Sequence, residues 1–301
     1  MTAQATMTTR ATMPGPAAEA GRAATRAHTP GPERTAAGTP GASGIWPGTL
    51  WHPASACDDH CRAGGFDPAA LVTAVVRVMA LGGVLLVGLL PVALLGGAAL
   101  RVMARLILTV LGVRLVWRGP APRPGSMVVA NHVSWLDAVA LAAVLPVRMV
   151  AKHDVRAWPG IGGTASRAGA IFIDRTRPSA LPGTVREVAA ALRAGCSVAV
   201  FPEGTTYCGP DRGRFRPALF QAAIDAGAPV VPVSVAYDST EASFVAGDTL
   251  GASVVRVARV RRVILTLVAA PALRPAPGAD RRALARAAQA SLPGGGYRLA
   301  A

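Results

Sequence analysis

The stretch between Arg77 and Arg101 contains no charged residue. As a helix, an apolar run of this length can cross the hydrocarbon core of a bilayer, which is roughly 30 Å thick. Two glycine pairs and Pro91 interrupt the run, so a single tilted span, a re-entrant helical hairpin and a buried pair of soluble helices all fit. We favour association with a membrane, and we expect residues 71–118 to form this hydrophobic helical segment.

Positive charge follows the apolar run directly, at residues 101, 105, 114 and 118. By the positive-inside rule the C-terminal side of the run faces the cytoplasm, so we expect a cell-membrane protein whose remaining domain lies on the cytoplasmic face. The whole chain carries 31 Lys+Arg and 16 Asp+Glu, a formal net charge of +15. Such a charge favours anionic partners, either membrane lipid or nucleic acid. Because the cations are spread along the chain and only 5% of residues are aromatic, we expect a membrane and no nucleic acid.

Residues 1–65 are rich in Pro, Gly, Ala and Thr and contain almost no large apolar side chains. Such a segment buries too little surface to offset its chain entropy, so we predict a disordered tail. Near its end, His52, Cys57, His60 and Cys61 lie close together. Their spacing fits no familiar zinc pattern and carboxylates crowd them, so we favour a plain linker without metal, a metal site being the alternative. The four cysteines of the chain make no disulfide framework, which is typical of a reducing, cytoplasmic setting.

Beyond residue 119, short β-branched runs alternate with Ala- and Arg-rich stretches of helical character. Alternating strands and helices predict an α/β domain over residues 119–275, with a central mixed sheet flanked by helices. A Pro-bounded start and a Gly stop predict a helix at 178–195, and a similar pattern predicts one at 216–227. Residues 276–301 are expected to form a C-terminal helix and tail. The predicted strands are residues 127–130, 147–151, 170–174, 197–201, 230–236 and 261–269.

The run RVARVRRV at residues 256–263 alternates arginine with apolar residues. This alternation favours a strand near the edge of the sheet, with its cations in solvent. A surface for anionic lipid or for an acidic protein partner is the alternative interpretation.

The heptapeptide NHVSWLD at residues 131–137 directly follows the predicted strand MVVA. Ser134 is typical of a helix N-cap, so His132 lies in the loop and Asp137 in the first helical turn. Such a turn can let Asp137 accept a hydrogen bond from one imidazole nitrogen, which leaves the other nitrogen free to act as a general base. In the alternative, Asp137 only completes a capping box with Ser134, and His132 is an exposed loop residue.

Two more predicted strands end in polar residues. GAIFIDR ends at Arg175, and FPEGTT at residues 201–206 contains Glu203 and Gly204. Glycine allows close approach of the backbone, threonine offers hydroxyl donors and arginine suits phosphate, so these strand ends predict a phosphate site. Each also has a plain explanation, Arg175 as a surface cation and Glu203 as a carboxylate at a helix start.

The order and spacing of the blocks N-H-x-x-x-x-D, G-x-x-F-x-x-R, F-P-E-G-T and V-P-V resemble the signature of the glycerolipid acyltransferase superfamily. Over roughly residues 70–275, the chain looks most similar to bacterial 1-acyl-sn-glycerol-3-phosphate acyltransferases and related lysophospholipid acyltransferases. The resemblance implies an α/β domain beside an N-terminal hydrophobic helical segment that sits in the membrane. It also implies transfer of an acyl chain from acyl-CoA or acyl carrier protein, as co-substrate, to the free hydroxyl of a lysophospholipid, with no cofactor and no acyl-enzyme.

The roles of individual residues follow from the same resemblance. His132 is implied to be the general base, and Asp137 to hold its tautomer and stabilise the imidazolium. Arg175 matches the family's phosphate-binding arginine. The other matched residues are implied to help bind the acceptor or to shape the first block, and they are Glu203, Gly204, Thr205, Thr206 and Asn131.

One position departs from the pattern, because the family often has arginine where this chain has Thr206. Either Arg212, Arg214 and Arg216, which follow closely, supply the phosphate contact, or the headgroup of the acceptor differs. We therefore expect 1-acyl-glycerol-3-phosphate as the acceptor, with another lysolipid such as a lyso-ornithine lipid as the alternative. A thioesterase or lipase is disfavoured because no G-x-S-x-G elbow occurs. A non-catalytic basic membrane-binding protein is the rival from a different class.

Overall fold

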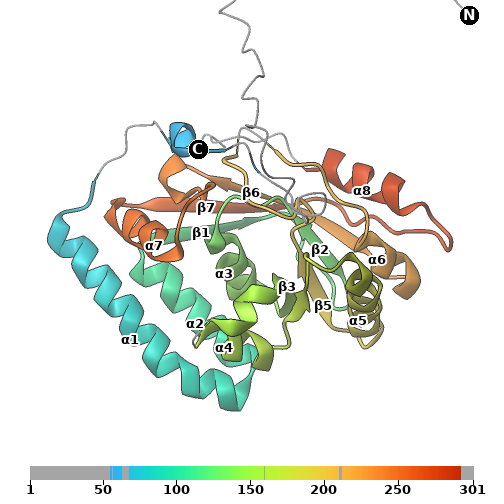
Figure 1. Cartoon of the computed structure of the whole chain (residues 1–301), viewed down its shortest axis with the longest axis horizontal. Helices are drawn as coiled ribbons and strands as arrows, with labels where there is room; N and C mark the ends of the chain where they lie inside the picture. The colour runs from blue at the N-terminus through green and yellow to red at the C-terminus, as the bar shows by residue number, and fades with distance from the viewer. Residues whose placement is uncertain (1–54, 56, 63–67, 159, 210–211, 293–301) are drawn as a thin grey trace, which may run out of the picture. The chain divides into compact units, whose positions relative to one another are not determined.

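The computed structural model describes residues 55, 57–62, 68–158, 160–209 and 212–292. Most of the predicted tail, including His52, lies outside these residues, as does the last part of the predicted C-terminal segment. Within the described residues, the chain forms a seven-stranded sheet with helices on both faces (Figure 1). The predicted α/β fold is thereby confirmed.

The sheet is mixed, as the sequence predicts, with the strand order β1-β7-β6-β2-β5-β3-β4. Every neighbouring pair is parallel except β6 and β7, which are antiparallel. The strands β2 to β6 therefore end along one edge of the sheet, which is where ligands bind in open α/β folds. The strands are β1 Val113–Arg118, β2 Met127–Ala130, β3 Val147–Lys152, β4 Ile171–Ile173, β5 Ser197–Val200, β6 Val230–Tyr237 and β7 Val263–Ala269.

The sequence of β2 is apolar throughout because the strand is buried on both faces of the sheet. Alternate residues of a strand point to opposite faces of the sheet. Val128 and Ala130 pack in one core with α2, α3 and α7, and Met127 and Val129 pack in a second core with α5, α6 and α8. The helices are α1 Leu71–Leu95, α2 Gly97–Val110, α3 Trp135–Val144, α4 Ile161–Arg167, α5 Leu181–Arg193, α6 Phe220–Ala226, α7 Leu250–Arg259 and α8 Arg281–Ala290, with short 3-10 helices η1 Asp59–Arg62, η2 His153–Ala157, η3 Pro178–Ala180 and η4 Thr240–Ala242.

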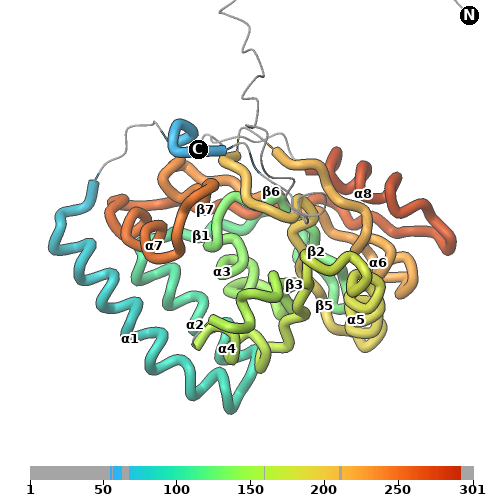
Figure 2. Tube along the Cα trace, in the orientation of Figure 1, coloured from blue at the N-terminus to red at the C-terminus, as the bar shows by residue number. Residues whose placement is uncertain are grey.

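Helices α1 and α2 form a hairpin that turns at Gly96, where φ is 61° (Figure 2). Helix α1 continues through Pro91 without a break, and it is long and apolar enough to cross a membrane. Arg77 attaches this helix to the domain by donating to three backbone carbonyls between residues 258 and 261. Elsewhere α1 exposes large apolar side chains along its length, among them Leu86 and Leu94.

The predicted helical segment 71–118 is too long at its C-terminal end. Helix α2 ends at Val110, Gly112 turns with φ 72°, and the residues after it form β1. Strand β1 pairs with β7 over its whole length, from Val113 to Arg118. Arg114 and Arg118 therefore belong to the sheet, because the end of the predicted helical segment is a strand.

The predicted strand at residues 256–263 is wrong for all but its last residue, because α7 continues to Arg259 and β7 begins at Val263. The side chain of Thr249 caps this helix by accepting from the N–H of Ala252 at 3.2 Å. Counted from this cap, Ser253 and Val257 recur at helical spacing and are both buried. Strand β7 begins only at Val263. The alternation of arginine with apolar residues therefore runs across two different elements.

Candidate active site at the carboxyl ends of the strands

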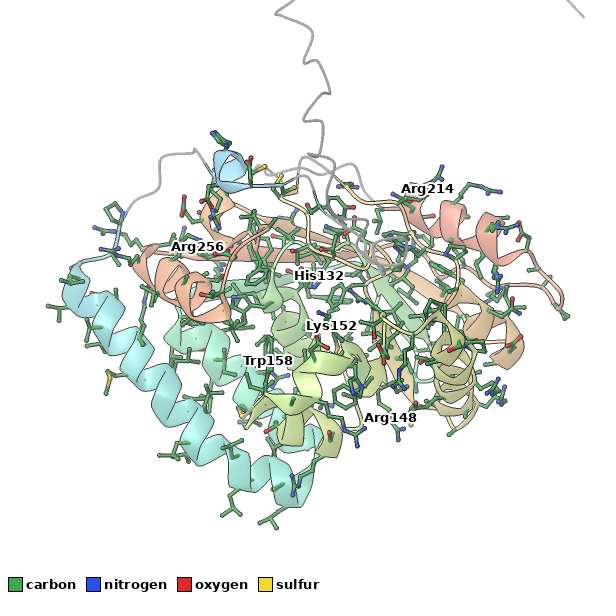
Figure 3. The ribbon with its side chains drawn as sticks, viewed as in Figure 1. His132, Arg148, Lys152, Trp158, Arg214 and Arg256 are labelled. Carbon is green, nitrogen blue, oxygen red and sulfur yellow. The ribbon has the colours of Figure 1, made fainter. Side chains whose placement is uncertain are left out.

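The carboxyl ends of β2, β5 and β6 meet at one edge of the sheet, because these strands pair in parallel. Strand β2 leads into His132, β5 leads into the FPEGTT segment at residues 201–206, and Tyr237 is the last residue of β6. Figure 3 shows His132 near the middle of the α/β domain, beside the start of α3. The fold thus brings together blocks that lie far apart in the sequence.

His132 and Asp137 form the contact that the sequence predicts. Imidazole Nδ1 lies 2.9 Å from Asp137 Oδ2. Asp137 is fully buried, whereas 21% of the His132 side chain is exposed. The imidazole stacks on the ring of Phe201, with 4.0 Å between the centroids and 14° between the planes. Within the described part of the chain, Nε2 has no hydrogen-bond partner, so it is available to accept a proton.

The capping role of Asp137 does not compete with its contact to His132. Oδ2 also accepts from the backbone N–H groups of Val133 at 2.6 Å and Ser134 at 2.9 Å, and with Ser134 it completes the capping box of α3. Oδ1 accepts from the hydroxyl of Tyr237 at 2.5 Å. Charge-assisted hydrogen bonds from several donors fix this buried carboxylate in the orientation that His132 needs.

Glu203 ties two loops of the site together. One carboxylate oxygen accepts from the backbone N–H of His132 at 2.6 Å, and the other accepts from that of Gly213 at 3.1 Å. Glu203 is only 2% exposed. Burial raises the pKa of this carboxyl to about 7, although the two N–H groups act in the opposite direction. Both carboxylate oxygens of Glu203 are therefore hydrogen-bonded to the protein backbone.

The raised pKa of Glu203 predicts a pH-dependent stability. Because the folded state holds this proton more tightly than the unfolded state, the stabilisation is complete below about pH 4.5 and is lost as the pH rises through about 7. A pKa raised from 4.5 to about 7 corresponds to about 3 kcal/mol of unfolding free energy. We expect the difference in unfolding free energy between the wild type and Glu203→Gln to decrease across this range, measured by denaturant titration in detergent. The exposed Glu187, changed to Gln, is the matched control. A difference that stays constant with pH would contradict this reading of Glu203.

Arg175 reaches the FPEGTT segment from the loop after β4. Its guanidinium donates to the carbonyl oxygen of Gly204, and Gly204 has φ 79°, in the left-handed region that favours glycine. Burial and the nearby positive charge of Arg216 lower the pKa of Arg175, while Asp154 acts in the opposite direction. Two neighbouring cations, one of them half-buried, favour an anionic ligand at this place.

Asn131 and Thr206 are engaged with the protein itself. Asn131 is buried, and its amide both donates to the carbonyl of Val235 at 3.0 Å and accepts from the N–H of Val235 at 2.7 Å, which extends the pairing of β2 with β6. The hydroxyl of Thr206 donates to the carbonyl of Phe244 at 2.5 Å. Thr205 is half-buried next to Gly204. Asn131 and Thr206 therefore shape the site from within.

The three arginines that follow the FPEGTT segment lie differently. Arg212 is half-buried, and its charge lowers the pKa of Glu203. Arg216 is exposed and close enough to Arg175 to affect its pKa. Arg214 is exposed and lies toward α8, apart from His132 in Figure 3. Arg212 and Arg216 thus add positive charge next to the site.

The block pattern alone did not identify Tyr237 and Phe201 as parts of the site. Tyr237 comes directly after the predicted strand 230–236, so the strand-end argument applied to His132 would also have found it. Phe201 begins the FPEGTT block, and we interpreted it only as the end of an apolar strand. A ring that stacks on an imidazole gives no sequence signal that distinguishes it from a core residue.

The chain is similar in sequence to known acyltransferases. Residues 116–236 match the family model described as Acyltransferase. A 1-acyl-sn-glycerol-3-phosphate acyltransferase of Neisseria meningitidis serogroup B is 40% identical over 137 residues, which cover 45% of this chain and 54% of that protein. A lyso-ornithine lipid O-acyltransferase of Pseudomonas aeruginosa is 36% identical over 176 residues, covering 57% of this chain and 67% of that protein. The chain spans about half the length of the first of these curated relatives.

The fold also has a counterpart among solved structures. The crystal structure of the 1-acyl-sn-glycerophosphate acyltransferase PlsC from Thermotoga maritima aligns with a TM-score of 0.56 at 20% sequence identity, covering 73% of this chain and 91% of that one. At this level of identity the likeness concerns the fold, and it extends beyond the residues matched by the family model.

Proposed function

Because the chain belongs to the glycerolipid acyltransferase family, we propose that it transfers a fatty acyl chain from an acyl thioester to the free hydroxyl of a lysophospholipid. The observation that carries this proposal is the pair formed by His132 and Asp137. A buried carboxylate fixes one imidazole nitrogen at 2.9 Å, and the other nitrogen, at a partly exposed strand end, has no hydrogen-bond partner among the described residues. This is the arrangement that a general base for a hydroxyl group requires.

The reaction needs one base and no acyl-enzyme intermediate. Nε2 of His132 takes the proton of the acceptor hydroxyl while the hydroxyl oxygen attacks the carbonyl carbon of the thioester. The tetrahedral intermediate then collapses, the carbon–sulfur bond breaks, and the imidazolium returns its proton to the leaving thiolate. Asp137 holds the tautomer with the proton on Nδ1 and stabilises the imidazolium. No electrons are exchanged with an external group, so we propose no cofactor, and the donor is acyl-CoA or an acyl carrier protein.

The favoured acceptor is 1-acyl-glycerol-3-phosphate, which would give phosphatidic acid. The guanidinium of Arg175 lies beside the Gly204 turn, with the charge of Arg216 nearby, and a guanidinium suits a phosphate group. The second candidate is a lyso-ornithine lipid. Two observations favour it: Thr206 stands where an arginine is frequent in the family, and the relative that carries this name matches a larger share of the chain.

We also propose that the helical hairpin holds the enzyme in one leaflet of the cell membrane, with the active site on the cytoplasmic face. Arg77 and Arg105 both donate to backbone carbonyls of the α/β domain, so both helices stay attached to it. The exposed apolar side of α1 then faces lipid, where a lysolipid acceptor is found. The positive charge of the chain supports contact with an anionic, cytoplasmic leaflet.

Release of the donor thiol tests the proposed reaction. The purified chain in detergent is supplied with an acyl-CoA, and free thiol is measured with and without 1-acyl-glycerol-3-phosphate or a lyso-ornithine lipid. We expect release that depends on an added lysolipid. Release that proceeds equally well without an acceptor would identify a thioesterase, and no release with either acceptor would contradict the proposal.

A change at Arg175 distinguishes the two acceptors. We expect Arg175→Gln to raise KM for 1-acyl-glycerol-3-phosphate about tenfold or more, because a hydrogen bond to a charged group contributes about 1.5–3 kcal/mol. The KM for a lyso-ornithine lipid, whose headgroup is no phosphate, should change little. Arg177, which is exposed and pairs with Asp174 at 2.6 Å, serves as the control when changed to Gln. An equal change for both acceptors would assign Arg175 a structural role.

The proposed membrane contact predicts a separate phenotype. Changing Leu86 and Leu94 together to Glu places two charges on the exposed apolar side of α1, and each charge in hydrocarbon costs about 2.5 kcal/mol or more. We expect this variant to be lost from anionic vesicles in a flotation assay while its thermal unfolding in detergent is unchanged. The matched variant with Ala at both positions should still float. Equal flotation of the Glu and Ala variants would contradict insertion of this side of α1.

A further inference from the structure

Three cysteines from two distant parts of the chain meet next to the proposed active site. The sulfur atoms of Cys57, Cys61 and Cys208 all lie within 4.8 Å of one another. Cys57 is 1% exposed and Cys208 is 2% exposed, and Cys61 is half-buried. The sequence pattern at residues 52–61 predicted no metal because its spacing fitted no known site, but that pattern did not include Cys208. The fold supplies the third sulfur.

We propose that these three thiols bind one Zn²⁺ ion, whether or not the chain transfers acyl groups. Thiolates are soft ligands that select Zn²⁺ among the divalent ions common in cells. Zinc–sulfur bonds of about 2.3 Å in tetrahedral geometry bring the sulfur atoms to about 3.8 Å from one another. Small side-chain rotations achieve this from the observed separation. A water molecule or an anion completes the coordination.

The surroundings of the cluster favour thiolate ligands. The backbone N–H of Cys208 donates to the sulfur of Cys57 at 3.1 Å, and such a donor stabilises negative charge on sulfur. His60 lies between two of the ligands in sequence, but it is turned away, with its side chain 94% exposed and Nδ1 paired with Asp58. A disulfide would use two of the three sulfurs and leave the third, whereas a single metal ion uses all three.

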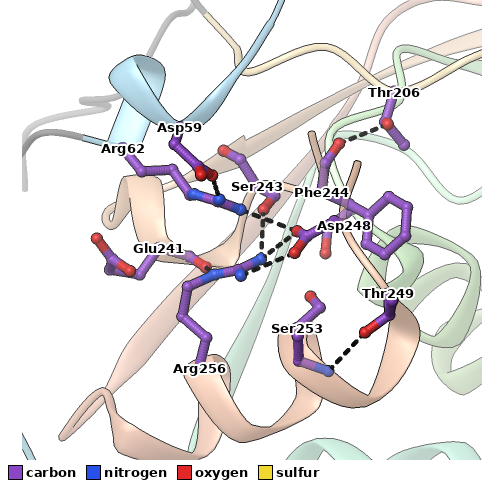
Figure 4. Close-up of polar contacts among 12 residues, drawn as sticks. Asp59, Arg62, Thr206, Glu241, Ser243, Phe244, Asp248, Thr249, Ser253 and Arg256 are labelled. Atoms are coloured by element: carbon purple, nitrogen blue, oxygen red, sulfur yellow. Dashed lines mark hydrogen bonds and ion pairs between the residues drawn. The ribbon is translucent and has the colours of Figure 1, made fainter. Parts of the chain in front are cut away.

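An ion-pair network holds η1 in the position that presents Cys61 to the cluster (Figure 4). Arg62, the last residue of η1, bonds to Asp248 at 2.9 Å and also pairs with Asp59. Asp248 in turn accepts two hydrogen bonds from Arg256, at 3.1 and 2.5 Å. Because these contacts do not involve the cysteines, η1 is positioned even without an ion. The site is therefore preorganised on one side, which lowers the cost of metal binding.

The bound ion would fasten the active-site loops to the segment that precedes α1. Tyr207, next to Cys208, donates its backbone N–H to the carbonyl of His132 at 2.8 Å. On the other side, the N–H of Ala246 bonds to the carbonyl of Cys57 at 3.2 Å, and the N–H of Phe244 bonds to the carbonyl of Val133 at 2.9 Å. Zinc at the cysteines thus acts as a structural link that keeps the loop around His132 in place.

The decisive measurement is the metal content of the full chain purified in detergent from cells supplied with zinc. We expect about one zinc ion per chain by elemental mass spectrometry, and a tenfold or greater loss of zinc in each of Cys57→Ser, Cys61→Ser and Cys208→Ser. Two variants are matched controls that should keep the ion. They are Cys196→Ser, which changes the fourth cysteine, packed against the core formed with α5, α6 and α8, and His60→Ala. Cobalt substituted into the wild type should give thiolate-to-metal charge-transfer absorption.

Three results would overturn the proposal. They are wild-type protein that contains no zinc and shows no charge-transfer absorption with cobalt, zinc that is retained by all three serine variants, and an intact mass two hydrogens lower, which would indicate a disulfide. Because the first and last tests use the unaltered chain, they do not depend on whether a variant folds. His132→Ala should bind zinc normally, so a failure of the metal site and a failure of the proposed acyl transfer are told apart.

Discussion

Replacing His132 with alanine is expected to lower kcat by about 10³-fold, within the range that a positioned acid–base group contributes. The loss is expected because Nε2 is the group that takes the proton of the acceptor hydroxyl. The fold should persist, since the bonds that Glu203 and Tyr207 make with this residue go to its backbone and not to its imidazole. Among the described residues, the imidazole loses its stacking on Phe201 and its contact with Asp137.

The measurement is acceptor-dependent release of thiol at saturating substrate, together with thermal unfolding in detergent. His60→Ala removes another imidazole, one that is almost fully exposed, and should keep wild-type activity. A His132→Ala variant that retains more than about a tenth of the wild-type kcat would show that another group acts as the base.

The change Asp137→Asn is expected to have the second-largest effect, lowering kcat on the order of 10²-fold to 10³-fold. The amide oxygen can still accept from the N–H groups of Val133 and Ser134, and Tyr237 can turn its hydroxyl to accept from the amide nitrogen. The helix cap is therefore kept while the negative charge is lost. Without that charge, the imidazolium that forms during the reaction is no longer stabilised.

A matched change separates the cap from the chemistry. Ser134→Ala removes the other half of the capping box of α3, and it should cost about 1 kcal/mol of unfolding free energy with little loss of activity. Asp137→Asn should show the opposite pattern, a large loss of kcat with a small loss of stability. If both variants lose stability and activity in proportion, Asp137 acts through the cap alone.

How much of this site can be predicted from the sequence depends on whether a contact is local. His132 and Asp137 are five residues apart, and a strand end followed by an N-cap is enough to predict that they meet. Alternating strands and helices also predict that the other blocks end at the same edge of the sheet. That β2 lies directly between β5 and β6 is set by the strand order. The hydroxyl of Tyr237 and the sulfur of Cys208 reach their partners only through sheet order and loop packing, which local patterns do not contain.

The errors in the predicted secondary structure have a similar origin. In residues 250–263, a helix end and a strand start follow one another within a few residues, and short runs of Arg and Val fit either period. Strand β1 falls within the predicted helical segment because its local sequence does not reveal its pairing with β7, which is far away along the chain. In such cases burial against a distant strand decides the secondary structure, and a short local segment of sequence carries no information about that burial.

The most direct test of the central claim is the mass of the product lipid. The purified chain and its His132→Ala variant are incubated with an acyl-CoA and isotopically labelled 1-acyl-glycerol-3-phosphate or lyso-ornithine lipid, and the lipids are analysed by mass spectrometry. We predict that the wild type converts a labelled lysolipid into a lipid that is heavier by one acyl group, and that the variant produces about a thousandth as much. Free fatty acid as the only acyl product, or equal formation of the diacyl lipid by both proteins, would contradict the account.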